Sequence, residues 1–372
     1  MAPDPTNKAA VLVTKAAPLV VQSVEYTAAG QNEVVVKNGA VAVNPYDWII
    51  EEAHNLVVPR IKLPFILGTD VAGEIVEVGE GVTRFKAGDR VVAHATALIK
   101  PINRSSQGGF QEYTVLRQDM TSSIPASISY EAACVLPLGL STAACALFQN
   151  DYLALPFPTT STSPAPSGTT LLVWGGATSV GCNAIQLAKA AGCEVITTAS
   201  PKNNAYLEHL GAAAVFDYRS PTVIRDLTAA FQNRQAAGAI SIGAGSLKAC
   251  IEVLGACQGN KFVAQCTLDL PAFPKSVLGF PPFVFGVASE IVSGTIRSRM
   301  KGVGTKFVNG GDLVGKEVGK AIYEDFLPEA LGAGTFVPAP DPFVVGKGLE
   351  RVQEAMDISK KGVSAKKVVV TL

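Results

Sequence analysis

Six consecutive residues between two apolar runs have the types and spacing of a phosphate-binding turn. They read Gly176-Ala177-Thr178-Ser179-Val180-Gly181. An apolar run over 171–174 precedes the turn, and an Ala-rich helical pattern over 179–191 follows it. A helix that begins there presents unpaired N–H groups and a partial positive charge, and glycine lets a pyrophosphate approach the chain closely. The turn favours dinucleotide binding, although Thr178 replaces the middle glycine of G-x-G-x-x-G. Ordinary strand-to-helix packing is the alternative.

The end of the next strand indicates which dinucleotide is preferred. NAD sites usually carry Asp or Glu about 20 residues after the glycines, where it binds the ribose 2′-hydroxyl. Here the predicted strand over 194–199 is followed by Ser200, Lys202 and Asn203, with no carboxylate. A hydroxyl and an ammonium favour a 2′-phosphate, so we expect NADPH; the alternative is that Lys202 is an ordinary loop lysine. Tyr218, after a predicted strand over 214–217, either closes the same pocket or is a surface tyrosine.

The elements that must position these residues follow an alternating pattern. Strands are predicted over 239–242 and 261–266, with helices over 223–232 and 246–254 between the strands. Such alternation predicts a parallel, doubly wound sheet of the Rossmann type. Before it, residues 68–93 give three short β runs punctuated by glycines, which suits a small, strongly curved β-barrel.

Length and composition exclude several classes of protein. The chain has 372 residues, 48% of them hydrophobic and 17% charged, with 31 basic and 31 acidic side chains. The balanced charge gives no electrostatic reason to bind nucleic acid, and there is no uninterrupted 18-residue apolar run that predicts a membrane span. Seven scattered cysteines without a C-x-x-C pair indicate reduced thiols, so we expect a cytoplasmic protein.

One further segment is unusually apolar for a loop. Residues 271–287 repeat Pro and Phe, and we expect them either to line a pocket or to cover an interface, with simple packing as the alternative.

Several motifs in order resemble the medium-chain dehydrogenase/reductase superfamily over nearly the whole chain. They are NPYDW from residue 44, GTDVAGEIVEVGEGVTRFKAGDRV from 68, GGFQEYTV from 108, LPLGLSTAACAL from 136, GGATSVG from 175 and GLERVQEAMDISKKGVSAKKVVV from 348. The resemblance is strongest to the zinc-free quinone reductase branch and to fungal trans-acting enoyl reductases. It implies an α/β fold: a GroES-like β-barrel catalytic domain over 1–135 and 307–372, and a Rossmann domain over 136–306.

The ligands for a zinc ion are missing from the sequence. Catalytic zinc needs about three N, S or O ligands and structural zinc usually four. No cysteine precedes Cys134, and Thr69-Asp70 stand where zinc-dependent members of the superfamily have His-Glu. His54 and His94 are isolated, so we expect no metal site.

Without a metal to stabilise an alkoxide, reduction of a conjugated C=C bond is easier than oxidation of an alcohol. An enone, quinone or enoyl thioester spreads the developing charge into an enolate, which hydrogen-bond donors stabilise. By resemblance, Thr142 contacts the nicotinamide, and Tyr46 and Trp48 line the substrate side as catalytic candidates. Ile49 stands where some related enoyl reductases have lysine.

Several alternatives for function stay open. The leading expectation is a reductase for a small hydrophobic substrate, acting as a monomer or a homodimer. A trans-acting enoyl reductase would instead act on a carrier-bound polyketide chain. A non-redox protein would bind NADPH without oxidising it, and a zinc alcohol dehydrogenase would hold stoichiometric metal.

Overall fold

The computed structural model describes residues 6–269, 271, 273–274 and 279–372. The chain forms two compact units, Met1–Ser141 with Leu313–Leu372, and Thr142–Asp312. The sequence placed the divisions at 135/136 and 306/307, six residues earlier in each case. The first division falls inside helix α3 (Pro137–Phe148), because this helix continues without a break from one unit into the other.

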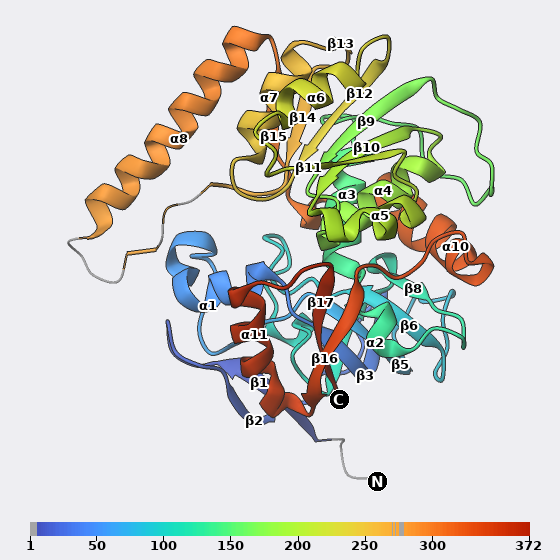
Figure 1. The fold of residues 1–372 in the computed structure, drawn as a ribbon. Helices are drawn as coiled ribbons and strands as arrows, with labels where there is room; N and C mark the ends of the chain where they lie inside the picture. Colours follow the sequence, from blue (N-terminus) through green and yellow to red (C-terminus); the bar gives the residue numbers. More distant parts are fainter. Residues whose placement is uncertain (1–5, 270, 272, 275–278) are drawn as a thin grey trace. The chain divides into compact units, whose positions relative to one another are not determined.

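The second unit is built on one parallel sheet with the strand order β11-β10-β9-β12-β14-β15, and β13 pairs with β12 (Figure 1). The strands are β9 (Thr169–Trp174), β10 (Glu194–Ala199), β11 (Ala214–Asp217), β12 (Gln235–Ser241), β13 (Gln258–Gly259), β14 (Phe262–Gln265) and β15 (Gly304–Phe307). This is the doubly wound order in which a ligand binds where the strand order reverses, here between β9 and β12. The predicted α/β fold class is confirmed.

Helices cover both faces of this sheet. They are α4 (Ser179–Ala190), α5 (Asn204–Leu210), α6 (Val223–Ala230) and α7 (Ser246–Gly255). The unit also contains α8 (Phe280–Lys301) and the 3₁₀ turns η3 (Pro201–Asn203) and η5 (Gly310–Leu313). Right-handed crossovers place α4 and α5 on one face and α6 and α7 on the other. The core between the sheet and the second pair includes Leu172, Leu227 and Ile251.

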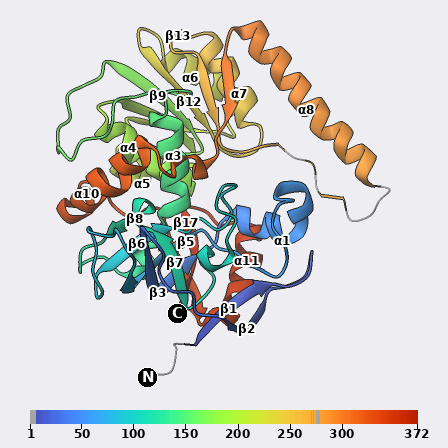
Figure 2. The same cartoon turned by 180° about the vertical axis from the view of Figure 1, so that it is seen from behind.

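The unusually apolar segment is partly helical. Residues 280–287 form the first two turns of α8, while 270, 272 and 275–278 lie outside the described residues. Figures 1 and 2 show α8 extending away from the rest of its own unit toward its N-terminal end.

The first unit contains two sheets, with the strand orders β2-β1-β4 and β16-β17-β3-β5-β6-β8; β7 also pairs with β3. The strands are β1 (Asn7–Leu12), β2 (Val20–Val24), β3 (Glu33–Ala42), β4 (Phe65–Ile66), β5 (Asp70–Val78), β6 (Arg90–His94), β7 (Tyr113–Arg117), β8 (Thr121–Ser123), β16 (Asp341–Lys347) and β17 (Lys366–Thr371). Because β17 pairs antiparallel with β3, the C-terminal tail completes the sheet that the N-terminal part begins.

The helices of this unit are α1 (Pro45–Val57), α2 (Tyr130–Ala133), α9 (Glu317–Lys320), α10 (Leu327–Ala333) and α11 (Val352–Lys361). Shorter turns are η1 (Ser105–Gln107), η2 (Gln118–Met120), the π-helix η6 (Ala321–Phe326) and η7 (Leu349–Arg351). Helix α11 packs on β17 and α1, which ties the tail to the N-terminal part.

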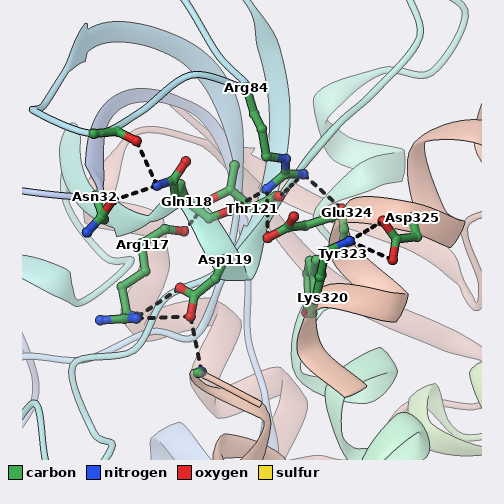
Figure 3. A network of polar contacts seen from close by, with 12 residues as sticks. Asn32, Arg84, Arg117, Gln118, Asp119, Thr121, Lys320, Tyr323, Glu324 and Asp325 are labelled. Atoms are coloured by element: carbon green, nitrogen blue, oxygen red, sulfur yellow. Dashed lines mark hydrogen bonds and ion pairs between the residues drawn. The ribbon is translucent and has the colours of Figure 1, made fainter. Parts of the chain in front are cut away.

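Arg84 anchors the C-terminal part of the first unit, which begins at Leu313, to the N-terminal part of the same unit (Figure 3). Its guanidinium donates to the carbonyls of Gln118 at 2.9 Å and Tyr323 at 3.3 Å, and lies 3.5 Å from the Glu324 carboxylate. The planar guanidinium therefore links η2, which directly precedes β8, to the π-helix η6.

Among the described residues, one stretch has the length and apolar composition of a membrane span. It is Tyr130–Phe148, and 78% of its apolar window is buried inside the protein, as in a core helix.

Candidate functional site

The predicted glycine turn lies between β9 and α4, in the second unit. Gly175 has φ +93°, a left-handed conformation that favours glycine and turns the chain from strand to helix. Thr178 is the N-cap of α4: its Oγ1 accepts the Gly181 N–H at 3.0 Å and donates to the Gly175 carbonyl at 2.8 Å. The residue that replaces the middle glycine of the fingerprint therefore holds the turn closed.

Two glycines of the turn are required by close packing. A Cβ at Gly181 would overlap the backbone of Gly175 and Gly176, and a Cβ at Gly176 would overlap Thr197 Oγ1. The last glycine of the fingerprint thus lets α4 approach β9, as in dinucleotide-binding turns. With the 12-residue helix α4 beginning at this point, the turn fits a pyrophosphate at a helix N-terminus.

The end of β10 lies beside the turn. Gly175 N–H donates to Thr198 Oγ1 at 3.0 Å, and Gly176 N–H donates to the Thr198 carbonyl at 2.9 Å. Ser200 follows β10 directly and caps the short turn η3, which contains Lys202 and Asn203. The structure therefore brings these three predicted residues to the same edge of the sheet as the glycine turn, and Lys202 is exposed there.

Tyr218 reaches the same edge from β11. Ala199 and Asp217 are paired in the parallel register, so the residues after them are neighbours. Tyr218 is 45% exposed, and the Arg219 guanidinium lies 5.7 Å from its ring centroid. Hydrogen bonds from the Arg219 backbone and side chain lower the pKa of Asp217. The sequence reasoning missed Arg219, although a basic residue directly after Tyr218 was the available signal.

Two further polar residues of this unit bear on the site. Ser241 ends β12, opposite Trp174 in register, and its buried Oγ has no hydrogen-bond partner among the described residues. It lies at the reversal of strand order, where doubly wound sheets bind ligands, and nothing in the local sequence singled it out. Thr142 is buried on α3, close against the backbone of Gly310; its predicted contact with nicotinamide stays a prediction.

Tyr46 and Trp48, the two catalytic candidates, belong to α1 in the first unit. Both are partly buried and pack against the core of that unit. Burial raises the pKa of the Tyr46 hydroxyl, and the Arg60 guanidinium partly offsets this effect. Trp48 Nε1 is buried without a hydrogen-bond partner among the described residues. Their catalytic role stays a prediction.

A buried polar cluster that the sequence did not predict lies next to α1. Lys367 Nζ is 2.8 Å from Asp70 Oδ2, and Lys367 also donates to Asn44 Oδ1. The Asn44 amide donates to Thr69 Oγ1 and to Asp70 Oδ2, both at 2.9 Å. Each of these polar groups is thus satisfied by another, as buried polar groups require.

The cluster also fixes the start of α3. Asp70 Oδ1 accepts the Leu138 N–H at 2.7 Å. His94 Nδ1 lies 2.9 Å from Ser141 Oγ, which in turn lies 2.8 Å from the Tyr323 hydroxyl. These contacts hold the N-terminal part of α3. Thr142 lies on the same helix, directly after Ser141.

Burial shifts two titratable groups near this cluster. Desolvation raises the pKa of Asp47 to about 7, although its carboxylate accepts the Asn44 N–H at 2.8 Å as the reciprocal part of an N-terminal cap. Desolvation lowers the pKa of His94 to about 4. At neutral pH His94 is therefore uncharged, and Asp47 is close to half-protonated.

The donors around Asp70 do not fit a zinc ion. Among the described residues no three His, Cys, Asp or Glu side chains are grouped to hold a metal. Asp70 is paired with Lys367, and His94 is bonded to Ser141. The nearby thiol, Cys134, has its pKa raised by burial, which disfavours the thiolate that binds zinc.

Comparison with known proteins gives two family matches. The family described as alcohol dehydrogenase GroES-like domain matches residues 30–126, and the family described as zinc-binding dehydrogenase matches residues 179–260. The first match lies in the first unit of the chain, and the second match lies in the second unit, which contains the parallel sheet.

Full-length relatives and solved structures agree with these matches. The dehydrogenase pigH of Monascus ruber is 51% identical over 99% of this chain and 100% of its own length. The trans-enoyl reductase himH of Aspergillus japonicus is 40% identical over 91% of this chain and 90% of its own length. A quinone oxidoreductase structure from Pseudomonas syringae has a TM-score of 0.71 at 22% identity, covering 98% of this chain and 100% of that one, which shows the shared fold.

Proposed function

Because this chain belongs to the medium-chain dehydrogenase/reductase family, we propose that it is an NADPH-dependent reductase of conjugated C=C bonds in enones, quinones or enoyl thioesters. Its relatives include proteins named trans-enoyl reductase. The observation that supports the choice of NADPH is the end of β10, beside the glycine turn. Ser200 and Lys202 follow this strand, and no carboxylate lies among the residues from Ser200 to Asn203.

Each part of the nucleotide has residues that would hold it. The turn from Gly176 to Gly181 and the N-terminus of α4 would bind the pyrophosphate. Ser200 and Lys202 would bind the 2′-phosphate, with Arg219 as a second cation at the same edge. Tyr218 would cover the adenosine end with its exposed ring.

When bound, the nicotinamide supplies the hydride for the reduction. The chain's own contribution is to bind and orient the two reactants. We assign no residue of the first unit as proton donor: burial raises the pKa of the Tyr46 hydroxyl and so makes it a weaker acid, and Asp70 and Lys367 are engaged with each other. The proton is then taken from solvent after the charge has spread into the enolate.

The cofactor preference is tested by binding measurements with NADPH and NADH. Lys202→Ala should weaken NADPH binding about tenfold, or about 1.4 kcal/mol, and leave NADH binding unchanged. Ser200→Asp should weaken NADPH binding further, because the new carboxylate would repel the 2′-phosphate. Lys189→Ala, an exposed lysine at the other end of α4, is the matched control. Equal affinities for the two nucleotides in the unmodified protein would refute the proposed phosphate contacts.

The reaction is tested by following NADPH oxidation with three acceptors: a free enone, a quinone and a pantetheine-linked enoyl chain. Oxidation with any of them supports the reductase. Activity with the pantetheine-linked chain alone would select a carrier-dependent enoyl reductase. Tight NADPH binding with no oxidation by any acceptor would identify a non-redox binding protein instead.

A further inference from the structure

Two loops of the first unit carry basic side chains without an acidic residue among them. Residues 58–69 include Arg60 and Lys62, and residues 95–111 include Lys100 and Arg104, while neither stretch contains an aspartate or a glutamate. The whole chain has 31 basic and 31 acidic side chains, so these loops hold a local excess of positive charge. Such an excess attracts anionic groups from solution.

The two loops are joined at Arg60. Its guanidinium donates a hydrogen bond to the Leu98 carbonyl, and Asn103 Nδ2 donates to the Arg60 carbonyl at 3.4 Å. Lys62 follows Arg60 by two residues and Lys100 follows Leu98 by two, and both lysines are exposed. The bonds at Arg60 therefore keep the two segments that carry these three positive charges side by side.

Arg60 has hydrogen-bonding capacity that the chain does not use. The first unit contains six arginines, and four of them lie within 3.5 Å of a carboxylate oxygen: Arg84, Arg104, Arg117 and Arg351. A fifth, Arg90, donates to two backbone carbonyls. Arg60 has no carboxylate partner in the part of the chain that the structure describes, and its Nε is buried without a hydrogen-bond partner there. A guanidinium offers five N–H donors, so Arg60 can bind a further acceptor.

The acidic residues of the neighbouring helix α1 are engaged elsewhere. The Glu51 carboxylate accepts a hydrogen bond from Gln353 at 3.1 Å, and Glu52 pairs with Lys360. Asp47 is completely buried. The positive charge of the two loops is therefore left for an anion from outside the chain.

Arg60 also lies beside Tyr46, one of the two catalytic candidates. Its guanidinium partly offsets the rise in the pKa of the Tyr46 hydroxyl that burial causes. The basic loops are thus next to the part of α1 where we expect the acceptor to bind.

The acceptor classes of the proposed reaction differ in charge. A simple enone or quinone is neutral, whereas an enoyl thioester of coenzyme A or of a carrier domain has a pantetheine arm that ends in a phosphate. Guanidinium and ammonium groups are the side chains that bind phosphate best.

We propose that Arg60, Lys62 and Lys100 bind the phosphate of a pantetheine thioester, and that this contact selects enoyl thioesters among the possible acceptors. The inference rests on the proposed reductase function, whose substrate class it names. Coenzyme A and a carrier domain both supply this phosphate, and the experiments below distinguish them.

Calorimetric binding of a thioester that cannot be reduced tests the site separately from the reaction. The probes are butyryl 4′-phosphopantetheine and butyryl pantetheine, which lacks the phosphate. Both are titrated into the full chain with saturating NADPH, so that the nucleotide site is already occupied. The phosphorylated probe should bind about tenfold more tightly, as expected for hydrogen bonds to a charged group. Added salt should reduce this preference.

Substitutions in the two loops should remove the preference for phosphate. Arg60→Gln should leave the affinities for the two probes within about twofold of each other. Because this variant also loses the bond to Leu98, Lys62→Gln/Lys100→Gln gives a second test at exposed positions and should lower the preference about threefold. Lys86→Gln, at an exposed lysine between β5 and β6, is the matched control and should keep the full preference. Circular dichroism should show the same fold in all of these variants.

Equal affinities for the two probes in the unmodified protein would overturn the proposal. A preference that survives both Arg60→Gln and the double lysine variant unchanged would do the same. The reductase proposal fails separately, if no acceptor oxidises NADPH, because the phosphate site is judged by binding alone. The source of the phosphate follows from kcat/KM: a higher value with crotonyl coenzyme A than with a crotonyl carrier domain identifies coenzyme A, and the reverse order identifies the carrier domain.

Discussion

Lys367 and Asp70 form an ion pair that is closed off from solvent: Nζ lies 2.8 Å from Oδ2, and the two side chains are 5% and 0% exposed. Asp70 also accepts the Leu138 N–H, so one carboxylate joins the last strand of the chain to the start of α3. A buried pair of this kind is costly to break, because the remaining charge has no solvent around it.

We therefore expect Lys367→Met to lower the free energy of unfolding by about 3–5 kcal/mol. The neighbouring Lys366 pairs with Asp341 on the surface, where the side chains are 45% and 58% exposed. Lys366→Met is the matched control and should cost about 1 kcal/mol or less. The double variant Asp70→Asn/Lys367→Met should recover part of the loss, since neither charge is then left alone. Urea unfolding measures all three, and equal effects at positions 366 and 367 would contradict the buried pair.

Asp47 should make the protein less stable as pH rises. Its folded pKa of about 7 lies above the ordinary value of 3.8, so its stabilising contribution is complete below pH 3.8 and is lost between pH 3.8 and 7. Asp47→Asn removes this loss. The unfolding free energy of this variant minus that of the unmodified protein should rise by about 1.4 kcal/mol per pH unit as pH rises through that window.

His94 should act in the opposite direction. Its folded pKa of about 4 lies below the ordinary 6.5, so its neutral form stabilises the fold above pH 6.5 and this contribution is lost as pH falls to 4. The unfolding free energy of His94→Asn minus that of the unmodified protein should therefore fall by about 1.4 kcal/mol per pH unit as pH rises from 4 to 6.5. In the unmodified protein the two slopes nearly cancel. Differences that do not change with pH would show that these groups are not buried as described.

Gly181→Ala should weaken both folding and nucleotide binding. The new Cβ would overlap the backbone of Gly175 and Gly176, so the turn must shift, at about 1–3 kcal/mol. In Gly294→Ala, by contrast, the Cβ would lie 3.8 Å from Leu247, an ordinary contact, and the helix should gain up to about 1 kcal/mol. Thermal unfolding and NADPH titration of both variants test this. Unchanged binding in Gly181→Ala would argue against the pyrophosphate contact.

Arg84→Lys should destabilise the barrel unit by about 1–3 kcal/mol, because a lysine cannot replace the planar fork that serves several backbone carbonyls (Figure 3). Glu324→Gln removes only the partly exposed ion pair and should cost about 1 kcal/mol or less. Chemical unfolding compares the two. A larger effect at Glu324 would mean that the ion pair, and not the carbonyl contacts, holds the returning chain.

Local pattern determined much of the nucleotide-binding half. The strands predicted over 194–199 and 214–217 have those bounds as β10 and β11, and the helix predicted from residue 179 begins there as α4. The family and the two-part α/β fold were also predicted correctly. Glycines, caps and apolar runs act over a few residues, so the sequence contains these signals in readable order.

The tertiary structure alone decided which distant residues meet. Lys367 donates a hydrogen bond to Asn44, which lies 323 positions earlier in the sequence. The sequence around neither residue predicts this contact. Residues 271–287 were predicted to line a pocket or to cover an interface, with simple packing as the alternative. Only the folded structure shows that the charged side chains of α8 pair with α7 while its apolar side chains are exposed. Hydrogen bonding within a helix or turn depends on residues a few positions apart, and the sequence therefore determined it. Burial, buried charge pairs and exposed faces depend on how the elements pack together, which is fixed only once the whole chain has folded.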